Sequence, residues 1–450
     1  MASPDPTGSG LRPDPLSPVE ELRRLDHAHF WHPFTQMGDW CDSEDDPLVL
    51  ASGRGATLTD TQGREYFDGN SSIWTNLHGH RHPGIDGAIR AQLERLAHCS
   101  ALGFSNEPAI RLAAKLVEVA PGDLLTRVFF TDDGSTAIEC ACRMAAQYRS
   151  RVGEEGRRHF VVFDRAYHGD TVGAASLGGI AAFHARHGGT GYAVHRFDSM
   201  AGVEAMDEAT ARSINAVVIE PLVQGAAGMR LWPAGMLRRL REWCDRNDVF
   251  LILDEVMTGF GRTGCLFACE HEGVVPDFLC LAKGLTGGYL PLAATLTTER
   301  VFSAFLGRFE EMKTFFYGHS YCGNPLGCAA ALANLRIFEE GRVLEGLPAK
   351  IAALADSLAD AAIRCPHFGE IRQLGLIAGI DLIDRETGEA FDWRRQTGAR
   401  VCRRARQHGL LTRPIRDTLT LMPPLCATEE QIRAAVSALA QSANEICGGA

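Results

Sequence analysis

Short apolar runs alternate with helix-like patterns along most of the chain, and this alternation is the first guide to its fold. Strands are predicted at Arg127–Thr131, His159–Phe163, Ala216–Glu220, Val249–Asp254 and Asp277–Leu281. Helices are predicted at Gly84–His98, Pro108–Val119 and Ser135–Arg149. The central strands are apolar at nearly every position, which is typical of a sheet covered by helices on both faces. The pattern predicts an α/β fold with a doubly wound, mostly parallel sheet.

The two ends of the chain follow different patterns. Residues 1–18 are rich in Pro, Ser, Gly and Asp, a composition that predicts a flexible leader. Two short strands are predicted at Pro47–Ala51 and Ala56–Thr59. Beyond about residue 330 the pattern consists of a long helix from Asn324, strand pieces at Glu370–Leu374 and Leu376–Leu382, and a final helix from Thr428. This last pattern predicts a smaller α+β domain.

Composition narrows the classes of function. The 450 residues are 45% apolar and 22% charged with a net charge of −11, which argues against nucleic acid as the main partner. No apolar run reaches the roughly 18 residues that a membrane helix needs, and the first residues lack the apolar core of a secretory signal. The 14 cysteines form no C-x-x-C pair, and several, such as Cys140, Cys142, Cys244 and Cys280, lie in apolar stretches. We therefore expect reduced cysteines and a cytoplasmic protein.

Polar residues follow the predicted strands, where ligands of α/β sheets gather. The first such group is Gly134 and Ser135, which open the helix after Arg127–Thr131. Glycine allows close approach of an anion, and the first turn of a helix offers free N–H groups. The pair is a candidate phosphate cradle, although a well-capped helix alone has the same pattern.

Four further strand ends carry a ring or a charge. Tyr167 could stack on a planar ligand, while Glu220 and Asp254 end apolar strands and need polar partners. Lys283, one of only four lysines, also ends such a strand, where burial lowers the pKa of an amine and makes it a nucleophile. Together with the cradle, this ordered set fits pyridoxal 5'-phosphate. Lys283 would form the Schiff base, and Asp254 would pair with the pyridine nitrogen.

Two other motifs predict no ligand site. Gly259–Gly264 matches G-x-G-x-x-G, but no clean helix follows it and no acid lies about 20 residues beyond, so it is predicted to be a loop. His78, His80 and His82 have no second ligand cluster, so we predict no metal site. The chain has no G-x-S-x-G, H-E-x-x-H or Walker A lysine motif.

The sequence as a whole resembles a known enzyme family. Val249–Gly264 and Asp277–Gly288 are similar to the class III, fold-type I aminotransferases, and the resemblance extends over about residues 30 to 440. It implies a large domain at 81–330 and a small domain formed by the chain ends, 19–80 and 331–450. It also implies an obligate homodimer with active sites at the subunit interface, acting on small molecules and not on nucleic acid or membranes.

The same resemblance implies a role for each matching residue. Gly134 and Ser135 would hold the cofactor phosphate, and Val256 and Tyr167 would cover its two faces. Glu220, Asp254 and Lys283 complete the predicted cofactor site, and Tyr167 joins Lys283 and Asp254 as a catalytic candidate. His319 and Ser320 would reach the cofactor of the neighbouring subunit. Residues expected at the substrate are Phe34, Trp74, Tyr167, Lys283, Gly318 and, for a carboxylate, Arg413.

Further motifs resemble the branch of this family that acts in biotin synthesis: Trp31–Met37, Ala166–Thr171, Ile219–Met229, Leu266–His271 and Gly318–Pro325. That branch converts 8-amino-7-oxononanoate to 7,8-diaminononanoate, with S-adenosylmethionine or lysine as amino donor. Members that use S-adenosylmethionine typically have Tyr at the position of Phe34, Trp at Ile73, and Pro-Thr at His319-Ser320. We therefore predict that lysine serves at least as well as S-adenosylmethionine.

Two alternatives remain open. Another class III ω-aminotransferase, acting on ornithine, a diamine or β-alanine, would carry the same cofactor residues. A regulator that binds the cofactor without catalysis is the other alternative, and the intact pair of Lys283 and Asp254 argues against it.

Overall fold

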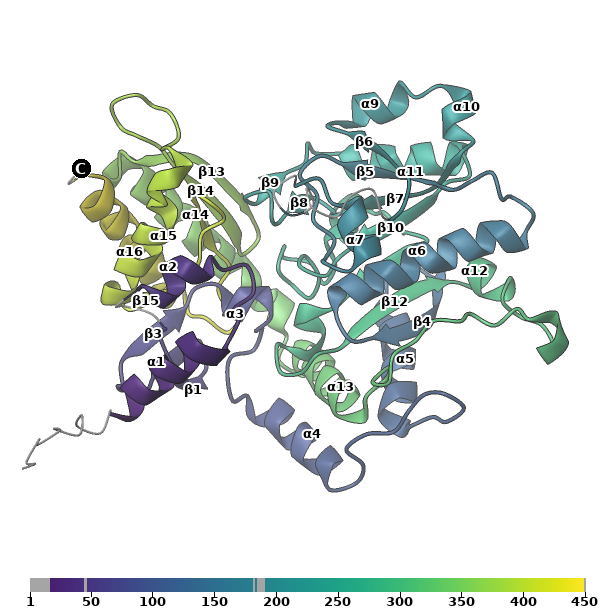
Figure 1. The fold of residues 1–450 in the computed structure, drawn as a ribbon, viewed down its shortest axis with the longest axis horizontal. Coiled ribbons are helices and arrows are strands. Elements are labelled where there is room, and N and C mark those ends of the chain that lie inside the picture. Colours follow the sequence, from purple (N-terminus) through teal and green to yellow (C-terminus); the bar gives the residue numbers. More distant parts are fainter. Residues whose placement is uncertain (1–16, 44–46, 181–182, 184–190, 449–450) are drawn as a thin grey trace, which may run out of the picture.

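A mixed sheet forms the centre of the computed structural model, which describes residues 17–43, 47–180, 183 and 191–448. Its strand order is β4-β12-β11-β10-β7-β5-β6 (Figure 1). The strands are β4 (Leu125–Thr131), β5 (His159–Phe163), β6 (Val194–Phe197), β7 (Ile214–Ile219), β10 (Phe250–Asp254), β11 (Phe278–Leu281) and β12 (Ala293–Thr298). Only β12 runs antiparallel to its neighbours, which confirms the predicted mostly parallel sheet.

Helices pack on this sheet and bury its central strands. Every residue of β7, β10 and β11 is buried, as their apolar runs predict. The helices of this large domain are α4 (Pro83–Leu93), α5 (Glu107–Val119), α6 (Gly134–Arg151), α7 (Val172–Leu177), α9 (Met200–Glu204), α10 (Glu208–Ala211), α11 (Met236–Arg246), α12 (Glu299–Ser303) and α13 (Pro325–Glu340). A short ribbon pairs β8 (Val223–Gln224) with β9 (Arg230–Leu231). Cys140, Cys142, Cys244 and Cys280 are buried here, whereas Cys41 and Cys426 elsewhere in the chain are exposed.

The two ends of the chain meet in the small domain. One sheet contains β1 (Leu50–Arg54), β2 (Thr57–Asp60), β3 (Glu65–Asp68) and, parallel to β3, β15 (Leu410–Leu411). The other is antiparallel and contains β13 (Phe368–Leu374), β14 (Ile377–Leu382) and β16 (Thr418–Leu421). Its helices are α14 (Leu347–Arg364), α15 (Thr397–Ala405) and α16 (Glu429–Cys447). The shared first sheet confirms that the chain ends form the small domain, while the numbered domain boundaries stay predictions.

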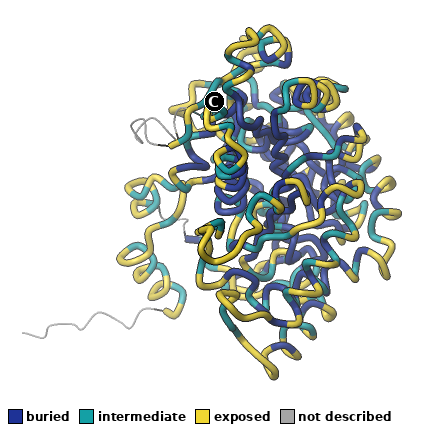
Figure 2. Tube along the Cα trace, turned by 90° about the vertical axis from the view of Figure 1, so that its right-hand side faces the viewer, coloured by how far each residue is buried: buried dark blue, intermediate teal, exposed yellow. Residues whose placement is uncertain are grey.

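The N-terminal segment differs partly from the prediction. Residues 1–16 of the predicted leader lie outside the described residues, but Ser17 caps helix α1 (Pro18–His29) through a capping box with Glu20. The predicted leader, 1–18, is therefore two residues too long, because Ser17 and Pro18 already form the start of this helix. α1 has no buried residue and lies on the exposed margin of the molecule (Figure 2). A second short helix, α2 (Met37–Cys41), follows it.

Two strands of the large sheet were not predicted, β6 and β12. β12 (AATLTT) has Leu296 as its one large apolar residue among alanines and threonines, so it carries no long apolar run, and β6 (VHRF) places charged and polar residues between its apolar ends. Both are recognised by their backbone pairing, which a hydrophobicity pattern does not record. Among the described residues, no helix has the length and the apolar character needed to cross a membrane.

Candidate active site

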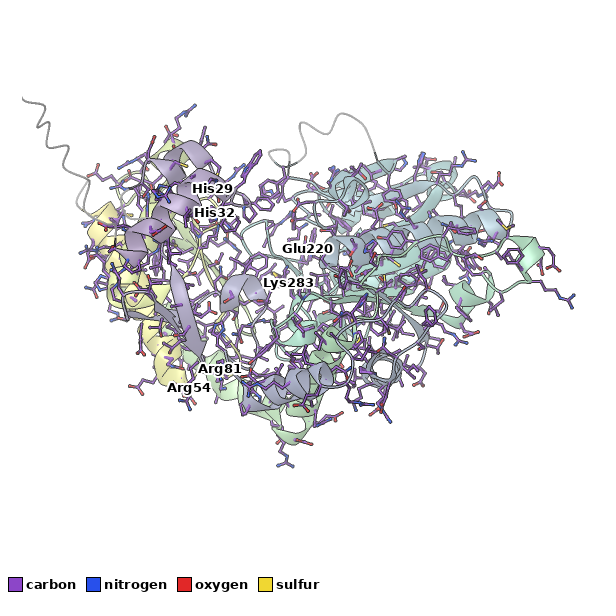
Figure 3. All side chains as sticks on the ribbon, turned by 60° about the horizontal axis from the view of Figure 1, so that its bottom comes forward. His29, His32, Arg54, Arg81, Glu220 and Lys283 are labelled. Atoms are coloured by element: carbon purple, nitrogen blue, oxygen red, sulfur yellow. The ribbon has the colours of Figure 1, made fainter. Side chains whose placement is uncertain are left out.

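A cavity of about 430 Å³ opens at the carboxyl ends of the parallel strands. The residues after β4, β5, β7, β10 and β11 all reach it, because parallel strands end at one edge of the sheet. Figure 3 shows Lys283 and Glu220 near the middle of the molecule, between the two domains. Eight residues predicted for the cofactor or the substrate line the cavity: Trp74, Gly134, Ser135, Tyr167, Glu220, Asp254, Val256 and Lys283.

Lys283 begins a short 3-10 turn directly after β11. Its backbone φ of 40° is left-handed, an uncommon conformation for a residue with a side chain. Burial lowers the pKa of its amine, and the nearby carboxylates of Asp254 and Glu220 oppose that shift in part. The Nζ atom lies 4.9 Å from the centre of the Trp74 ring. This environment favours a neutral, nucleophilic amine that faces the cavity.

Asp254 ends β10 with its carboxylate held by two donors. Oδ2 lies 2.8 Å from Nδ1 of the buried His168, and Oδ1 accepts a hydrogen bond from the backbone N–H of Val256 at 3.1 Å. The other ring nitrogen of His168, Nε2, has no partner among the described residues. His168 thus fixes the orientation of Asp254, a role that no prediction assigned. Its position next to Tyr167, after an apolar strand, was the available signal.

Glu220 is a buried carboxyl group beside this pair. Its two oxygens accept hydrogen bonds from the backbone N–H groups of Tyr167 at 3.2 Å and of Gly225 at 2.9 Å. Burial raises the pKa of Glu220 to about 7, with the negative charge of Asp254 adding to the rise and His168 opposing it. Glu220 can therefore carry a proton near neutral pH.

The start of α6 forms the floor of the cavity. Asp133 caps the helix by accepting a hydrogen bond from the N–H of Thr136 at 2.9 Å. A Cβ atom on Gly134 would lie 2.7 Å from Cγ1 of Val256, so only glycine fits at this position. The result is an open helix start with an apolar side chain against it. This geometry suits a phosphate, because the first amides and the helix dipole both attract anions.

Tyr167 stands at the edge of the cavity. Its hydroxyl donates a hydrogen bond to Oδ2 of Asp170 at 2.6 Å, and burial together with this bond raises the pKa of the phenol. The ring of Phe34 meets the ring of Tyr167 edge-on, with 6.4 Å between centroids. Phe34 itself is exposed and does not line the cavity.

The remaining predicted residues lie outside the cavity. Nδ1 of His319 is 2.9 Å from Oδ2 of Asp132, a lining residue, while Gly318 and Ser320 do not reach the lining. Arg413 is exposed and donates a hydrogen bond to the backbone oxygen of Phe34 at 3.0 Å. In this chain the predicted substrate arginine thus contacts the N-terminal segment.

Trp74 reaches the cavity from an unusual backbone turn. Ser71, Ser72, Ile73 and Trp74, designated α3 (Ser71–Trp74), all have positive φ, between 47° and 67°, so the turn is left-handed. This conformation costs about 1–2 kcal/mol for each residue with a side chain. Such a run must be held by its surroundings, and strained backbone of this kind concentrates at functional sites.

The two motifs for which no ligand site is predicted form parts of the fold. The ring of His78 packs on Phe338, Nε2 of His80 lies 3.1 Å from Asp68, and Nδ1 of His82 accepts a hydrogen bond from Gly84 at the start of α4. Residues 259–264 form a loop, followed by the 3-10 turn Ala268–Glu272.

A half-buried lysine, a buried carboxylate and an open helix start gather at the strand ends of one α/β sheet, an arrangement typical of pyridoxal-phosphate transferases. The family model described as "Aminotransferase class-III" matches residues 41–442, and this chain belongs to that family.

Named relatives and solved structures agree with this assignment. The chain is 49% identical to the adenosylmethionine-8-amino-7-oxononanoate aminotransferase of Nitratidesulfovibrio vulgaris, over 94% of this chain and 82% of that protein. It is 45% identical to the enzyme of the same name from Geobacter sulfurreducens, over 96% and 99%. The crystal structure of the Methanocaldococcus jannaschii enzyme superposes with a TM-score of 0.92 at 40% identity, covering 95% and 99% of the two chains. An amine transaminase from an uncultivated Pseudomonas species, solved in a PLP-bound form, has a TM-score of 0.86 at 35% identity, covering 93% and 99%.

Proposed function

We propose that this class III aminotransferase transfers an amino group to 8-amino-7-oxononanoate, giving 7,8-diaminononanoate for biotin. The observation that carries the proposal is the joint position of Lys283, Asp254 and the Gly134–Ser135 helix start around one cavity. The named relatives supply the acceptor substrate. The motifs of the biotin branch, such as Trp31–Met37, support the same acceptor.

Pyridoxal 5'-phosphate fits the residues present. Gly134 and Ser135 would hold the phosphate at the start of α6, where a side chain on Gly134 would collide with Val256. Val256 and Tyr167 would cover the two faces of the ring, and Asp254, oriented by His168, would hold a proton on the pyridine nitrogen. When bound, the cofactor supplies an electron sink for the carbon that carries the amino group.

The chain's own residues handle the protons. Lys283 provides an amine that can take a proton from the donor carbon and later return one to the acceptor carbon. Its lowered pKa suits both steps, because the amine must be neutral before it accepts the proton. Glu220, with its pKa near 7, limits the negative charge around Lys283. Trp74 closes one side of the cavity and reduces the access of water to the amine.

The amino donor is the finer part of the proposal. We infer that lysine serves at least as well as S-adenosylmethionine, because Phe34 offers no hydroxyl and Ile73 no aromatic ring for a bulky adenosyl donor. The names of the relatives include adenosylmethionine, so S-adenosylmethionine is the competing donor. A single-turnover assay that follows the absorbance of the bound cofactor compares the two. Reaction with S-adenosylmethionine and none with lysine would refute the lysine proposal.

The acceptor needs its own test. Purified protein loaded with pyridoxal phosphate and an amino donor should convert 8-amino-7-oxononanoate to 7,8-diaminononanoate, measured by mass spectrometry. The alternative is a general ω-aminotransferase, which the similarity to an amine transaminase also supports. It is tested with ornithine, a simple diamine and β-alanine as substrates. Faster transfer from or to these compounds, with none to 8-amino-7-oxononanoate, would contradict the proposal.

We also propose a homodimer with active sites at the subunit interface. The cavity is lined by Asp132, Asp133, Glu220 and Asp254 but by a single lysine, so a bound phosphate would need further donors. His319 and Ser320 of a second chain are the candidates. Exposed apolar side chains lie close in sequence to this loop or to His98, whose ring contacts Tyr321: Leu102, Phe104, Phe309, Met312, Phe316 and Tyr321. Such a patch is typical of an interface.

Mixing two inactive variants tests the shared site. Lys283→Ala chains mixed with His319→Ala/Ser320→Ala chains should regain up to about a quarter of the normal activity, because half of the dimers then hold one intact site. No recovery after exchange of subunits, or an active monomer by light scattering, would contradict the shared site. The absence of disulfides among the described cysteines supports a reducing compartment, and we propose the cytoplasm.

A further inference from the structure

Arg262 is a buried cation that the chemistry proposed above does not use. It lies in the glycine-rich loop after β10, and it is 1% exposed. Its Nη1 donates hydrogen bonds to the backbone oxygen of Pro423 at 2.8 Å and to Oγ of Ser71 at 3.2 Å. Its Nη2 donates to the backbone oxygen of Asn76 at 2.9 Å. All three acceptors are neutral oxygens, so this charge is buried without the compensation that an ion pair would give.

These acceptors belong to two different regions. Ser71 begins the left-handed turn, Asn76 follows its end, and Pro423 comes from the small domain next to β16. Ser71 is itself fully buried and donates its hydroxyl to the backbone oxygen of Met422 at 2.6 Å. The fork of Arg262 therefore joins the end of a central strand to the turn and to the small domain.

Further hydrogen bonds hold the left-handed turn, and together they fix the position of the Trp74 side chain. Asp68 accepts hydrogen bonds from the N–H and the hydroxyl of Ser72, both at 2.8 Å, and Asn70 accepts one from the indole N–H of Trp74 at 2.7 Å. The ring of Trp74 then lies over the Lys283 amine. Gly225 packs beside this arrangement, because a Cβ there would lie 2.4 Å from Sδ of Met257 and 3.3 Å from the Trp74 ring.

We propose that Arg262 is a positioning residue that holds the left-handed turn Ser71–Trp74 and thereby keeps the Trp74 indole over the Lys283 amine. The turn cannot hold itself, since four consecutive residues with side chains occupy a conformation that such residues avoid. The fixed positive charge of Arg262 also disfavours protonation of Lys283. The proposal rests on the assignment of Lys283 as the amine that captures the cofactor.

The test compares two buried arginines. Arg262→Lys keeps the charge but loses the fork, and Arg149→Lys makes the same change at a residue that is also 1% exposed. Arg149 lies near the other end of α6, about 22 Å along the helix from Gly134. The readouts are the melting temperature and the rate at which the cofactor-free chain captures pyridoxal phosphate, trapped with borohydride and located on Lys283 by mass spectrometry. We expect both variants to have a lower melting temperature. Only Arg262→Lys should slow the capture of pyridoxal phosphate, by about ten- to a hundredfold.

A rescue variant separates positioning from general damage. Adding Ile73→Gly to Arg262→Lys should restore most of the capture rate, because glycine adopts positive φ without strain and Ile73 is 46% exposed. Ile73→Val is the matched control, since it keeps the branched side chain and should restore nothing. If Arg262→Lys does not fold, Ser72→Ala loosens the same turn from an exposed position.

Three outcomes would overturn the proposal. One is equal slowing of capture by Arg262→Lys and Arg149→Lys, and another is the absence of rescue by Ile73→Gly. The third, for Ser72→Ala, is a capture rate equal to that of the unmodified chain. If the unmodified chain itself does not capture pyridoxal phosphate at Lys283, the failure lies with the proposed function instead.

Discussion

The two halves of the predicted site are built in different ways. The cofactor half, with Lys283, Asp254 and Glu220, stands on buried strand ends of one sheet. The substrate half, with Phe34 and Arg413, comes from the chain ends and is exposed. In the first half the backbone hydrogen bonds of the sheet set the spacing, whereas the second half depends on turns and loops.

The two halves of the site are therefore held rigid by different interactions. Asp254 ends β10 and Lys283 comes just after the neighbouring strand β11, so their separation is set by strand pairing. Arg413 and Phe34 hold each other through one hydrogen bond at the surface. Changes in the cofactor half should therefore abolish function, while changes in the substrate half should shift the preference among substrates.

The largest effect is expected from Lys283→Ala. Without the amine, the chain has no group to capture the cofactor or to move the proton, and activity should fall by about a thousandfold or more. Lys350→Ala is the control, because Lys350 is also partly buried but contacts the backbone oxygen of Leu425. Steady-state rates and the melting temperature provide the measurement. Retained activity in Lys283→Ala would assign the chemistry to another lysine.

Asp254→Asn should follow, with a loss of about a hundredfold in kcat, because a neutral amide cannot hold a proton on the pyridine nitrogen and leaves His168 without its charged partner. Asp245→Asn, at an exposed carboxylate of α11, is the control. Stopped-flow measurement of cofactor absorbance reports the rate. If both variants react at the normal rate, Asp254 has no role at the cofactor.

Glu220→Gln should change how stability depends on pH. The pKa of Glu220 is raised from 4.5 to about 7, so the folded chain binds this proton more tightly than the unfolded chain. The unmodified protein should therefore lose about 2 kcal/mol of stability between pH 5 and pH 7 relative to the glutamine variant. Urea unfolding of the cofactor-free proteins at several pH values measures it, with the surface change Glu242→Gln as control. Parallel pH profiles for Glu220→Gln and the unmodified chain would show that burial does not hold this proton.

The smallest effect is expected from Phe34→Tyr in the substrate half. A hydroxyl at this position adds one hydrogen-bonding group beside Tyr167, worth about 1 kcal/mol, and should shift the ratio of kcat/KM for S-adenosylmethionine over lysine upward by about fivefold to tenfold. Activity with lysine should stay within a factor of about two. An unchanged ratio would remove Phe34 from the donor site.

The sequence predicted the cofactor half more completely than the substrate half. Asp254 and Lys283 follow long apolar runs, so the strands that carry them could be identified from hydrophobicity, and the sheet brings their ends together. The glycine of the cradle was visible as well, because it stands between a strand and a helix. These residues line one cavity, although their chemical roles stay predictions until they are tested.

Other features could not be predicted because they depend on tertiary packing. His168 orients Asp254 from a different strand end, and no spacing in the sequence links the two residues. The left-handed turn at Ser71–Trp74 contains no glycine, so its composition does not predict positive φ angles. Arg262 lies in a glycine-rich loop whose sequence predicts no partner for it, and its acceptors lie far away in the chain. β12 was missed for the same reason, since its identity comes from its neighbours.

The pairing of β15 with β3 has a consequence for the making of this protein. Phe67 pairs with Leu410, near the opposite end of the chain. On the ribosome, β3 therefore presents an unpaired edge until Leu410 and Leu411 have been synthesised. Contacts between such distant segments form slowly, because a long loop must close first. Chaperone demand and aggregation of nascent chains should therefore depend on the first sheet, and chains truncated before residue 410 should be degraded or aggregate.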